Sequence, residues 1–286
     1  MMNYNDLPGL RWSTLKAGLQ SPLHLKHAME QPRKDTDTLR RGRRVHVATL
    51  QPERWGEFYS AGPDLSSVRT KDGKPAANPL ATTEGRALMA EWLSANPGVE
   101  IVGDAAADEA KRIAAAVWAH SVAGAVLDEC VGREVMYQAI IDGYAAKCQA
   151  DLYSGRTGTL GDLKTIGKML SERAMQRQIL DYGYHGQMAW YRRVMLACGV
   201  TVDRCVLIFV EAAAPHDVAV VDVSDEWLEL GEELVDQALA AYAQVVAGNA
   251  VGRFPGVVAL DVPAWMQSDE ANDDDVDGME LEGLNG

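Results

Sequence analysis

The amino-acid sequence predicts an α/β fold in which a mixed central β-sheet is flanked by helices, with a helical N-terminal part. Two observations support this prediction: the apolar periodicity changes from helical to strand-like near residue 134, and helices and strands then follow in blocks. Such an order of elements is typical of one sheet covered by helices. The composition agrees with a globular protein, because 47% of the residues are hydrophobic and 24% are charged.

The first part of the chain is predicted to be mainly helical. Apolar residues recur at helical spacing in four segments, which are 13–19, 36–50, 84–93 and 108–130. Pro52 ends the second segment, because proline lacks the amide donor that a helix interior needs. Residues 60–82 contain Gly, Pro, Ser and Lys without a clear period, so we expect a long mobile loop there.

The second part of the chain supplies the strands. Three strand-like runs are bounded by glycine pairs, at 134–141, 146–153 and 160–166. A helical region at 171–198 follows, and Gly183 and Gly186 predict a break or kink within it. Two more strands and a long last helix complete the order, at 205–211, 218–223 and about 225–248.

The charge of the chain is unevenly distributed. We expect one domain over residues 8–266, followed by an acidic disordered tail at 267–286. The net charge is −14, and eight acidic residues of the tail account for −8 of it, which leaves −6 for the rest. Residues 33–44 carry six bases against two acids. The net negative charge of the chain therefore does not exclude a nucleic-acid partner, because binding of nucleic acid depends on the electrostatic potential at the contact surface.

Several classes of protein are excluded by what the sequence lacks. No run of about 18 uncharged apolar residues is present, so we expect no membrane-spanning helix. The N-terminal residues do not have the pattern of a signal peptide, which predicts a cytoplasmic protein. The four cysteines form no CxxC pair and match no zinc or iron–sulfur spacing, so we expect reduced thiols.

Residues 147–165 form the segment with the clearest chemistry. Its Ser-Gly-Arg-Thr-Gly-Thr stretch has the composition of a turn, and a hairpin centred between Arg156 and Thr157 places Asp151 opposite Asp162. Directly opposed side chains lie about 4.5–5.5 Å apart, where two carboxylates repel unless a cation or a proton intervenes. Lys164 projects from the same face as Asp162. Carboxylate oxygens suit Mg²⁺, and an ammonium beside them can orient a water molecule.

An ordinary hairpin with a solvated polar face explains the same residues, because the D-x-K pattern is short and common. Three further features change this balance: the residues around Gln187, His46, and the basic run at 40–44, which is either a solvated helix face or, near a metal site, a place to bind phosphates. Gln187 and Tyr191 lie one helical turn apart, next to Arg192, and could contact a nucleic-acid backbone. His46 follows a basic run and could bind a metal ion when neutral. The alternatives are a core helix with a charged edge for the first feature and a surface histidine for the second.

The order of these motifs resembles the PD-(D/E)XK nuclease superfamily. The motifs are GxxxH at 42–46, AD at 150–151, GDLKT at 161–165 and QxxxY at 187–191. Within the superfamily the chain resembles the RecB-type exonucleases, and most of all the RecE (exodeoxyribonuclease VIII) type of phages and prophages. Ala150 replaces the proline of the superfamily name, and the cysteine set of the iron–sulfur relatives is missing. The likeness extends from about residue 13 to residue 265.

The resemblance implies a restriction-endonuclease-like core and a role for each matching residue. It implies that the catalytic metal is bound by His46, Asp151, Asp162 and the carbonyl of Leu163. Lys164 would act on the attacking water, and Glu134 matches a further acidic catalytic position. The candidate DNA-binding residues are Gln187, Tyr191, Thr165, Arg192, Arg43 and Arg44.

The implied function is a Mg²⁺-dependent DNA exonuclease, with Mn²⁺ as a substitute ion. It would act on double-stranded ends in the 5′-to-3′ direction and leave 3′ single strands for recombination by a RecT-like annealing protein. The resemblance also implies a ring-like homo-oligomer in a bacterial host cell. The alternatives are a RecB-like endonuclease, a CRISPR-adaptation nuclease and a non-catalytic DNA-binding protein with a nuclease fold. The intact set of Asp151, Asp162 and Lys164 argues against the last of these.

Overall fold

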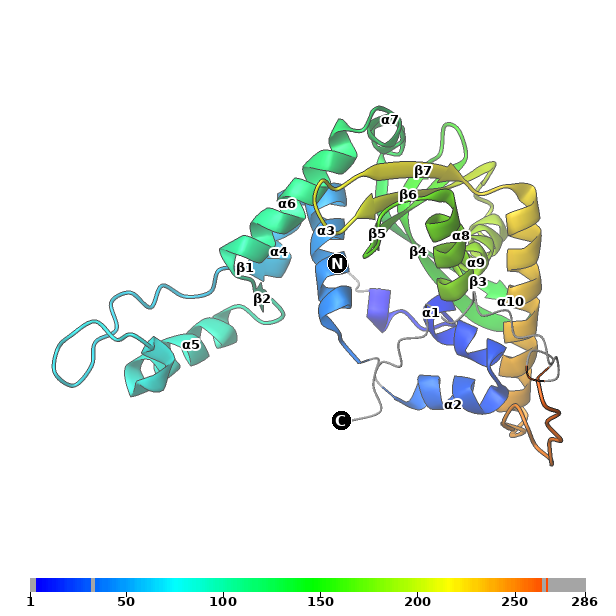
Figure 1. Ribbon diagram of the computed structural model, residues 1–286, viewed down its shortest axis with the longest axis horizontal. Coiled ribbons are helices and arrows are strands. Elements are labelled where there is room, and N and C mark those ends of the chain that lie inside the picture. Colours follow the sequence, from blue (N-terminus) through cyan, green and yellow to red (C-terminus); the bar gives the residue numbers. More distant parts are fainter. Residues whose placement is uncertain (1–3, 32–33, 264–265, 267–286) are drawn as a thin grey trace.

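A five-stranded mixed sheet forms the centre of the computed structural model, which describes residues 4–31, 34–263 and 266 (Figure 1). The strands lie side by side in chain order: β3 (Gly132–Ile141), β4 (Tyr144–Ser154), β5 (Thr159–Ile166), β6 (Arg204–Glu211) and β7 (Val218–Asp222). Hairpins make three of the pairs antiparallel, whereas β5 and β6 are parallel because a helical connection separates them. The predicted α/β fold class is confirmed.

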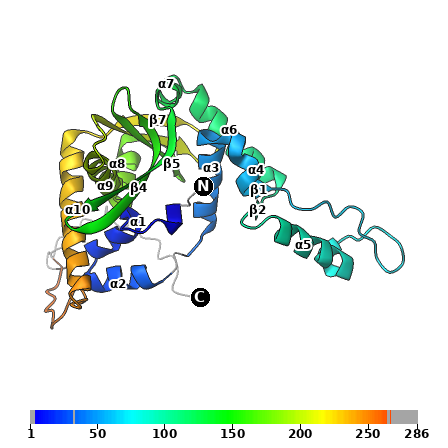
Figure 2. The same ribbon diagram turned by 180° about the vertical axis from the view of Figure 1, so that it is seen from behind.

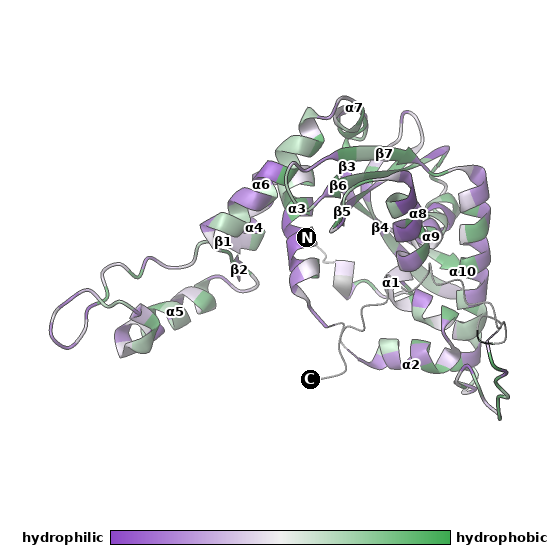
Figure 3. Ribbon diagram, in the orientation of Figure 1, coloured by the Kyte–Doolittle hydropathy of each residue, from purple (hydrophilic) through white to green (hydrophobic). Residues whose placement is uncertain are grey.

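One face of the sheet is covered by the N-terminal helices and by the helices around β6 and β7. These are α1 (Trp12–Leu15), α2 (Pro22–Glu30), α8 (Glu172–Tyr182), α9 (Tyr184–Ala197) and α10 (Asp225–Val246). They share a buried core with the strands, in which Trp190, Phe209 and Leu15 are fully enclosed. In Figure 3, α8 is largely hydrophilic. The helical region predicted at 171–198 is broken at Gly183, which adopts a positive φ of 67° between α8 and α9.

The other face of the sheet is covered by three helices. These are α3 (Asp37–Leu50), α6 (Asp104–Ala119) and α7 (Ser121–Glu129). The helix predicted at 108–130 is therefore two helices, because the chain turns at His120, whose ring accepts a hydrogen bond from the amide of Ala123. Helix α2 was not predicted, although Ser21 caps it and Pro22 occupies its first position. No helix among the described residues is long and apolar enough to cross a membrane.

Residues 59–101 form an arm that projects from the body (Figures 1 and 2). Its base is a short parallel pair of β1 (Tyr59–Ser60) and β2 (Glu100–Ile101), and its outer part contains α5 (Thr83–Ala95). The short α4 (Trp55–Phe58) leads into the arm. Most of the predicted loop at 60–82 has no regular structure, as expected from its composition. The predicted acidic tail at 267–286 lies outside the described residues.

The hairpin of β4 and β5 has the predicted register. Leu152 pairs with Gly161 and Ser154 with Thr159, so the hairpin is centred between Arg156 and Thr157. The pairing ends at Leu152 and Gly161, one residue before Asp151 and Asp162. Beyond that point β4 continues along β3, while β5 continues along β6. The two strands therefore separate at the two aspartates.

Strand β4 also changes the face that it presents at this point. Residues two apart on a regular strand share a face. Ala150 nevertheless packs in the core beneath α9 and α10, whereas Leu152 packs in the core beneath α3, α6 and α7. Asp151 lies between them, where the regular alternation of side chains between the two faces of β4 is broken.

Two helical glycines provide a test of this packing. A Cβ atom at Gly231 of α10 would overlap the carbonyl oxygen of His185, whereas one at Gly42 of α3 would meet no neighbouring element. We expect Gly231→Ala to lower the free energy of unfolding by about 1–3 kcal/mol through overpacking. Gly42→Ala should raise it by up to about 1 kcal/mol, because alanine favours a helix over glycine. Urea denaturation measures both values, and a stabilised Gly231→Ala protein would contradict the close packing of α9 and α10.

Candidate active site

The carboxylates of Asp151 and Asp162 lie where β4 and β5 separate, and both are almost fully buried. The amide of Leu163 donates a hydrogen bond of 2.9 Å to Asp151 Oδ2, so the backbone of β5 holds the aspartate of β4. Burial and the charge of Asp151 raise the pKa of Asp162 to about 6. Burial also raises the pKa of Asp151. Two acids with raised pKa values at one place indicate a site that favours a bound cation.

Lys164 and Gln187 hold the carboxylate of Asp162. Lys164 Nζ forms an ion pair with Asp162 Oδ2 and donates to Gln187 Oε1 at 3.0 Å, while Gln187 Nε2 donates to Asp162 Oδ1 at 2.7 Å. The ammonium also lies 4.5 Å from the ring centre of Tyr184. Burial alone would lower the pKa of Lys164, but Asp162 and Asp151 raise it. Lys164 therefore carries its proton and acts as a hydrogen-bond donor.

His46 of α3 reaches the same place from the opposite face of the sheet. Its Nδ1 atom lies 3.4 Å from Asp151 Oδ2 and 3.8 Å from Glu134 Oε1, and its Nε2 atom lies 2.7 Å from the carbonyl oxygen of Leu163. Burial alone would lower the pKa of His46, but the carboxylates of Asp151 and Glu134 raise it to about 9. The imidazole is therefore protonated and places a positive charge between two carboxylates.

Glu134 reaches this cluster through an unusual backbone conformation. It lies on β3 between Arg133, which pairs with Leu152, and Val135, which pairs with Ala150. Its φ angle is 51°, a left-handed value that costs a residue other than glycine about 1–3 kcal/mol. This conformation occurs directly across from Asp151, and such strain is often concentrated at functional sites.

The residues present fit a divalent cation. Ligand atoms of His46, Glu134 and Asp151 all lie within 4.8 Å of one another. Two carboxylates and one imidazole are a donor set for Mg²⁺ or Mn²⁺. His46 Nε2 contacts the Leu163 carbonyl, which leaves Nδ1 facing the carboxylates, as is usual for a metal-binding histidine. The carboxylate of Asp162 lies outside this group, because it faces Lys164 and Gln187.

The predicted DNA-binding residues are divided between several places. Gln187 and Tyr191 lie beside the cluster, where burial and the charge of Asp162 raise the pKa of Tyr191 well above its ordinary value. Thr165 follows Lys164 on β5, and its buried hydroxyl has no hydrogen-bond partner among the described residues. These three residues lie on or next to β5, the strand that carries Asp162 and Lys164, so their positions are compatible with the predicted role.

The arginines of α3 are paired with acidic residues. Arg43 donates to both oxygens of Asp35 at 2.8 and 2.9 Å, and Arg44 lies 3.3 Å from Glu100. Arg41 of the same run donates to Glu109 at 2.6 Å. The local positive charge predicted for residues 33–44 is therefore partly compensated within the fold, so Arg43 and Arg44 would have to exchange these partners to bind phosphates.

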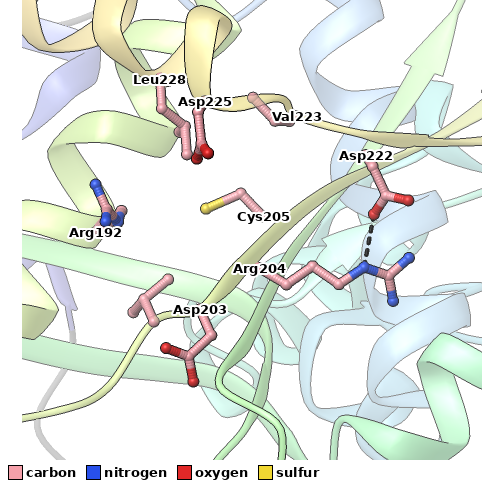
Figure 4. Close-up of a pocket in the computed structure, with 9 residues that line it drawn as sticks. Arg192, Asp203, Arg204, Cys205, Asp222, Val223, Asp225 and Leu228 are labelled. Atoms are coloured by element: carbon pink, nitrogen blue, oxygen red, sulfur yellow. Dashed lines mark hydrogen bonds and ion pairs between the residues drawn. The ribbon is translucent and has the colours of Figure 1, made fainter.

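Arg192 lies away from the cluster, in a pocket of about 200 Å³ where β6 begins and β7 ends (Figure 4). The pocket is also lined by Asp203, Asp222 and Asp225, and none of the clustered residues contributes to it. Arg192 follows Gln187 by five residues on α9, which turns its side chain about 140° around the helix axis. Arg192 therefore lines a pocket apart from the clustered residues, and its DNA-binding role stays a prediction.

Two residues near the cluster were missed by the sequence analysis. Tyr184, whose ring lies beside Lys164, precedes Gln187 by three residues on α9 and therefore shares its helix face. The sequence contained this signal. Tyr4 lies near enough to Tyr191 to contribute, after burial and the charge of Asp162, to the raised pKa of Tyr191. Nothing in the local sequence indicated this proximity, because it results from the path of the N-terminal segment.

Comparison with known proteins identifies a related family and a related fold. The family model described as "PDDEXK-like domain of unknown function (DUF3799)" matches residues 12–254. The crystal structure of a candidate exonuclease from Eubacterium rectale has a TM-score of 0.55, covers 94% of this chain and 98% of that chain, and shares 12% identity. A structure of SSO0001 covers 43% of this chain and 52% of that chain at 15% identity, with a TM-score of 0.26. No curated protein sequence matches the chain.

Metal binding should depend on pH in a way that identifies His46. In the metal-free protein the pKa of the His46 imidazole is about 9, and the pKa of the Asp162 carboxyl is about 6. A cation must displace the proton of His46, so the affinity for Mn²⁺ should rise between pH 5.5 and 8.5. At pH 7.5 about one proton should be released for each Mn²⁺ bound.

Calorimetric titration in buffers of different ionisation enthalpy measures this proton release. The His46→Ala protein should bind Mn²⁺ more weakly and release no proton at pH 7.5. If the wild-type and His46→Ala proteins released the same number of protons for each Mn²⁺ bound, His46 would not be a ligand of the metal.

Proposed function

The chain belongs to the family of PDDEXK-like domains, and from this premise we propose that it is a divalent-metal-dependent deoxyribonuclease that degrades double-stranded DNA from its ends. The observation that supports this proposal is the convergence of Asp151, Asp162 and Lys164 at the point where β4 and β5 separate. His46 and Glu134 complete an oxygen-rich cluster there. A cation held by such a cluster would stabilise the negative charge that increases on the phosphate as the bond breaks.

Each residue of the cluster has a separate task in this proposal. Asp151, Glu134 and His46 hold the cation, which when bound lowers the pKa of the attacking water and stabilises the charge on the phosphate. Lys164 carries its proton, so it orients the water or donates to a phosphate oxygen, and it does not act as the base. Gln187 fixes the direction of the Lys164 ammonium through its hydrogen bond of 3.0 Å.

Further features of the proposal come from the resemblance of the motifs. The candidate exonuclease of Eubacterium rectale has the same fold over nearly its whole length, which supports an exonuclease rather than an endonuclease. We infer 5′-to-3′ digestion that leaves 3′ single strands for an annealing protein, and a ring-like assembly of several copies around the DNA. Mg²⁺ is the proposed ion, with Mn²⁺ as a substitute.

Digestion of labelled linear duplexes tests the proposed reaction. Duplexes labelled at the 5′ or the 3′ end, with closed circular DNA as control, should show Mg²⁺-dependent loss of linear DNA only. Early release of the 5′ label would support the proposed polarity. Cleavage of closed circles at a similar rate would instead indicate an endonuclease, and no cleavage of any substrate with Mg²⁺ or Mn²⁺ would contradict the proposal.

The Lys164→Ala variant tests the role of the ammonium. It should bind the duplex with nearly wild-type affinity but lower the single-turnover rate about 10²–10⁴-fold, the usual contribution of water positioning or proton transfer. Lys111→Ala, at an exposed position of α6, is the matched control and should leave the rate unchanged. If Lys164→Ala lost only DNA affinity and kept its single-turnover rate, the ammonium would be an electrostatic anchor.

A further inference from the structure

The N-terminal residues 4–10 lie along the edge of β4 that β5 leaves open. Leu10 forms a parallel bridge with Ala146, in which its amide donates to the Ala145 carbonyl at 2.8 Å and its carbonyl accepts from the Lys147 amide at 2.8 Å. This edge is available because β4 and β5 pair only as far as Leu152 and Gly161. Both ribbon views place the first turn of the chain, Tyr4–Asp6, between α3 and α1 (Figures 1 and 2).

Lys147 fixes this N-terminal segment to the strand. Its side chain is buried, and its Nζ donates to the carbonyl oxygens of Tyr4 at 2.8 Å and Leu7 at 2.6 Å. The same ammonium lies 4.6 Å from the ring centre of Tyr4. Gln138 adds a hydrogen bond of 2.6 Å to the carbonyl of Pro8. A buried ammonium is costly unless it is paired, so these contacts define one position for Tyr4.

The same stretch of β4 contacts α9 beside the catalytic cluster. Trp190 Nε1 donates to the carbonyl of Lys147 at 3.0 Å, and Cys148 Sγ lies 3.9 Å from the carbonyl oxygen of Tyr191. Adjacent residues of β4 therefore contact both tyrosines, Lys147 at the ring and carbonyl of Tyr4 and Cys148 at the carbonyl of Tyr191. Burial raises the pKa of both phenols, so both hydroxyls keep their protons.

The two hydroxyls have unused hydrogen-bonding capacity. Neither the Tyr4 nor the Tyr191 hydroxyl makes a hydrogen bond to a residue that the structure describes. A partly enclosed hydroxyl without a partner in the protein is available to a ligand or to water. Phenols are neutral donors, so they can bind an anion beside the acidic cluster without adding to its negative charge. Phosphate oxygens accept strong, charge-assisted hydrogen bonds of this kind.

We propose that Tyr4 and Tyr191 together bind one phosphate of the DNA strand that enters the catalytic cluster, with Lys147 holding Tyr4 in place. This inference rests on the proposed function and extends it to a residue outside the part of the chain that the family model matches. Tyr4 is then a DNA-binding residue, and Lys147 is a positioning residue that acts through it. Contacts to phosphate carry no sequence information, which suits an enzyme that digests any duplex.

Equilibrium binding of an end-labelled duplex to the full-length chain tests the inference without requiring cleavage. Tyr4→Phe removes only the hydroxyl and should weaken binding about 10-fold, the expected loss for a hydrogen bond to a charged group. Tyr242→Phe is the matched control, because that ring packs edge-to-face on Tyr144 of the β3–β4 hairpin. It should bind like wild type. Lys147→Met should weaken binding as much as Tyr4→Phe, and the double variant should lose little more.

A duplex with one neutral methylphosphonate group identifies the phosphate. At one position near the end, the substitution should weaken wild-type binding about 10-fold but leave the affinity of Tyr4→Phe unchanged, because the two changes remove the same contact. Unchanged affinity of Tyr4→Phe, or additive losses at every position, would overturn the inference. Cleavage by the wild type in that case leaves the proposed function intact. Conversely, Tyr4-dependent binding without any cleavage would overturn the proposed function alone.

Discussion

The repulsion between two buried aspartates on neighbouring strands is the constraint on which the rest of the site depends. Asp151 and Asp162 occupy the first positions after the pairing of β4 and β5 ends, and both have raised pKa values. In the metal-free protein two cations compensate their charge. Lys164 pairs with Asp162 from the same strand, and His46 approaches Asp151 from α3. A bound cation would take over the role of the His46 proton, so the site is arranged for positive charge before any ion arrives.

The fold supplies this arrangement from both faces of the sheet. Helix α3 brings His46 from the core of α6 and α7, while α9 brings Gln187 and Tyr191 from the core of α10. Strand β4 passes from one core to the other at Asp151, which lets side chains from opposite faces meet there. The positive φ of Glu134 on the neighbouring strand adds a third acid to the same place. Close packing of the two cores fixes these positions, because neither core leaves room for the strands to slide.

The features that depend on local sequence could be predicted. Turn composition predicted the register of the hairpin as far as the pair of Leu152 and Gly161, and Gly183 marked the helix break. The features that depend on distant contacts could not be predicted. The pairing of Arg44 with Glu100 joins parts of the chain 56 residues apart, which meet only after folding. The position of Tyr4 likewise depends on a bridge between segments more than 130 residues apart.

Anomalous scattering from a crystal of the full-length protein grown with Mn²⁺ tests most directly whether the separated strands form a metal site. A difference peak at Asp151, shared with Glu134 and His46, is the expected result, because these residues provide the clustered ligand atoms. The metal-free crystal should lack the peak and should keep His46 against the carboxylates. A peak that appears only at other acids, such as Asp203 and Asp222 of the pocket around Arg192, would contradict a metal centre between β4 and β5.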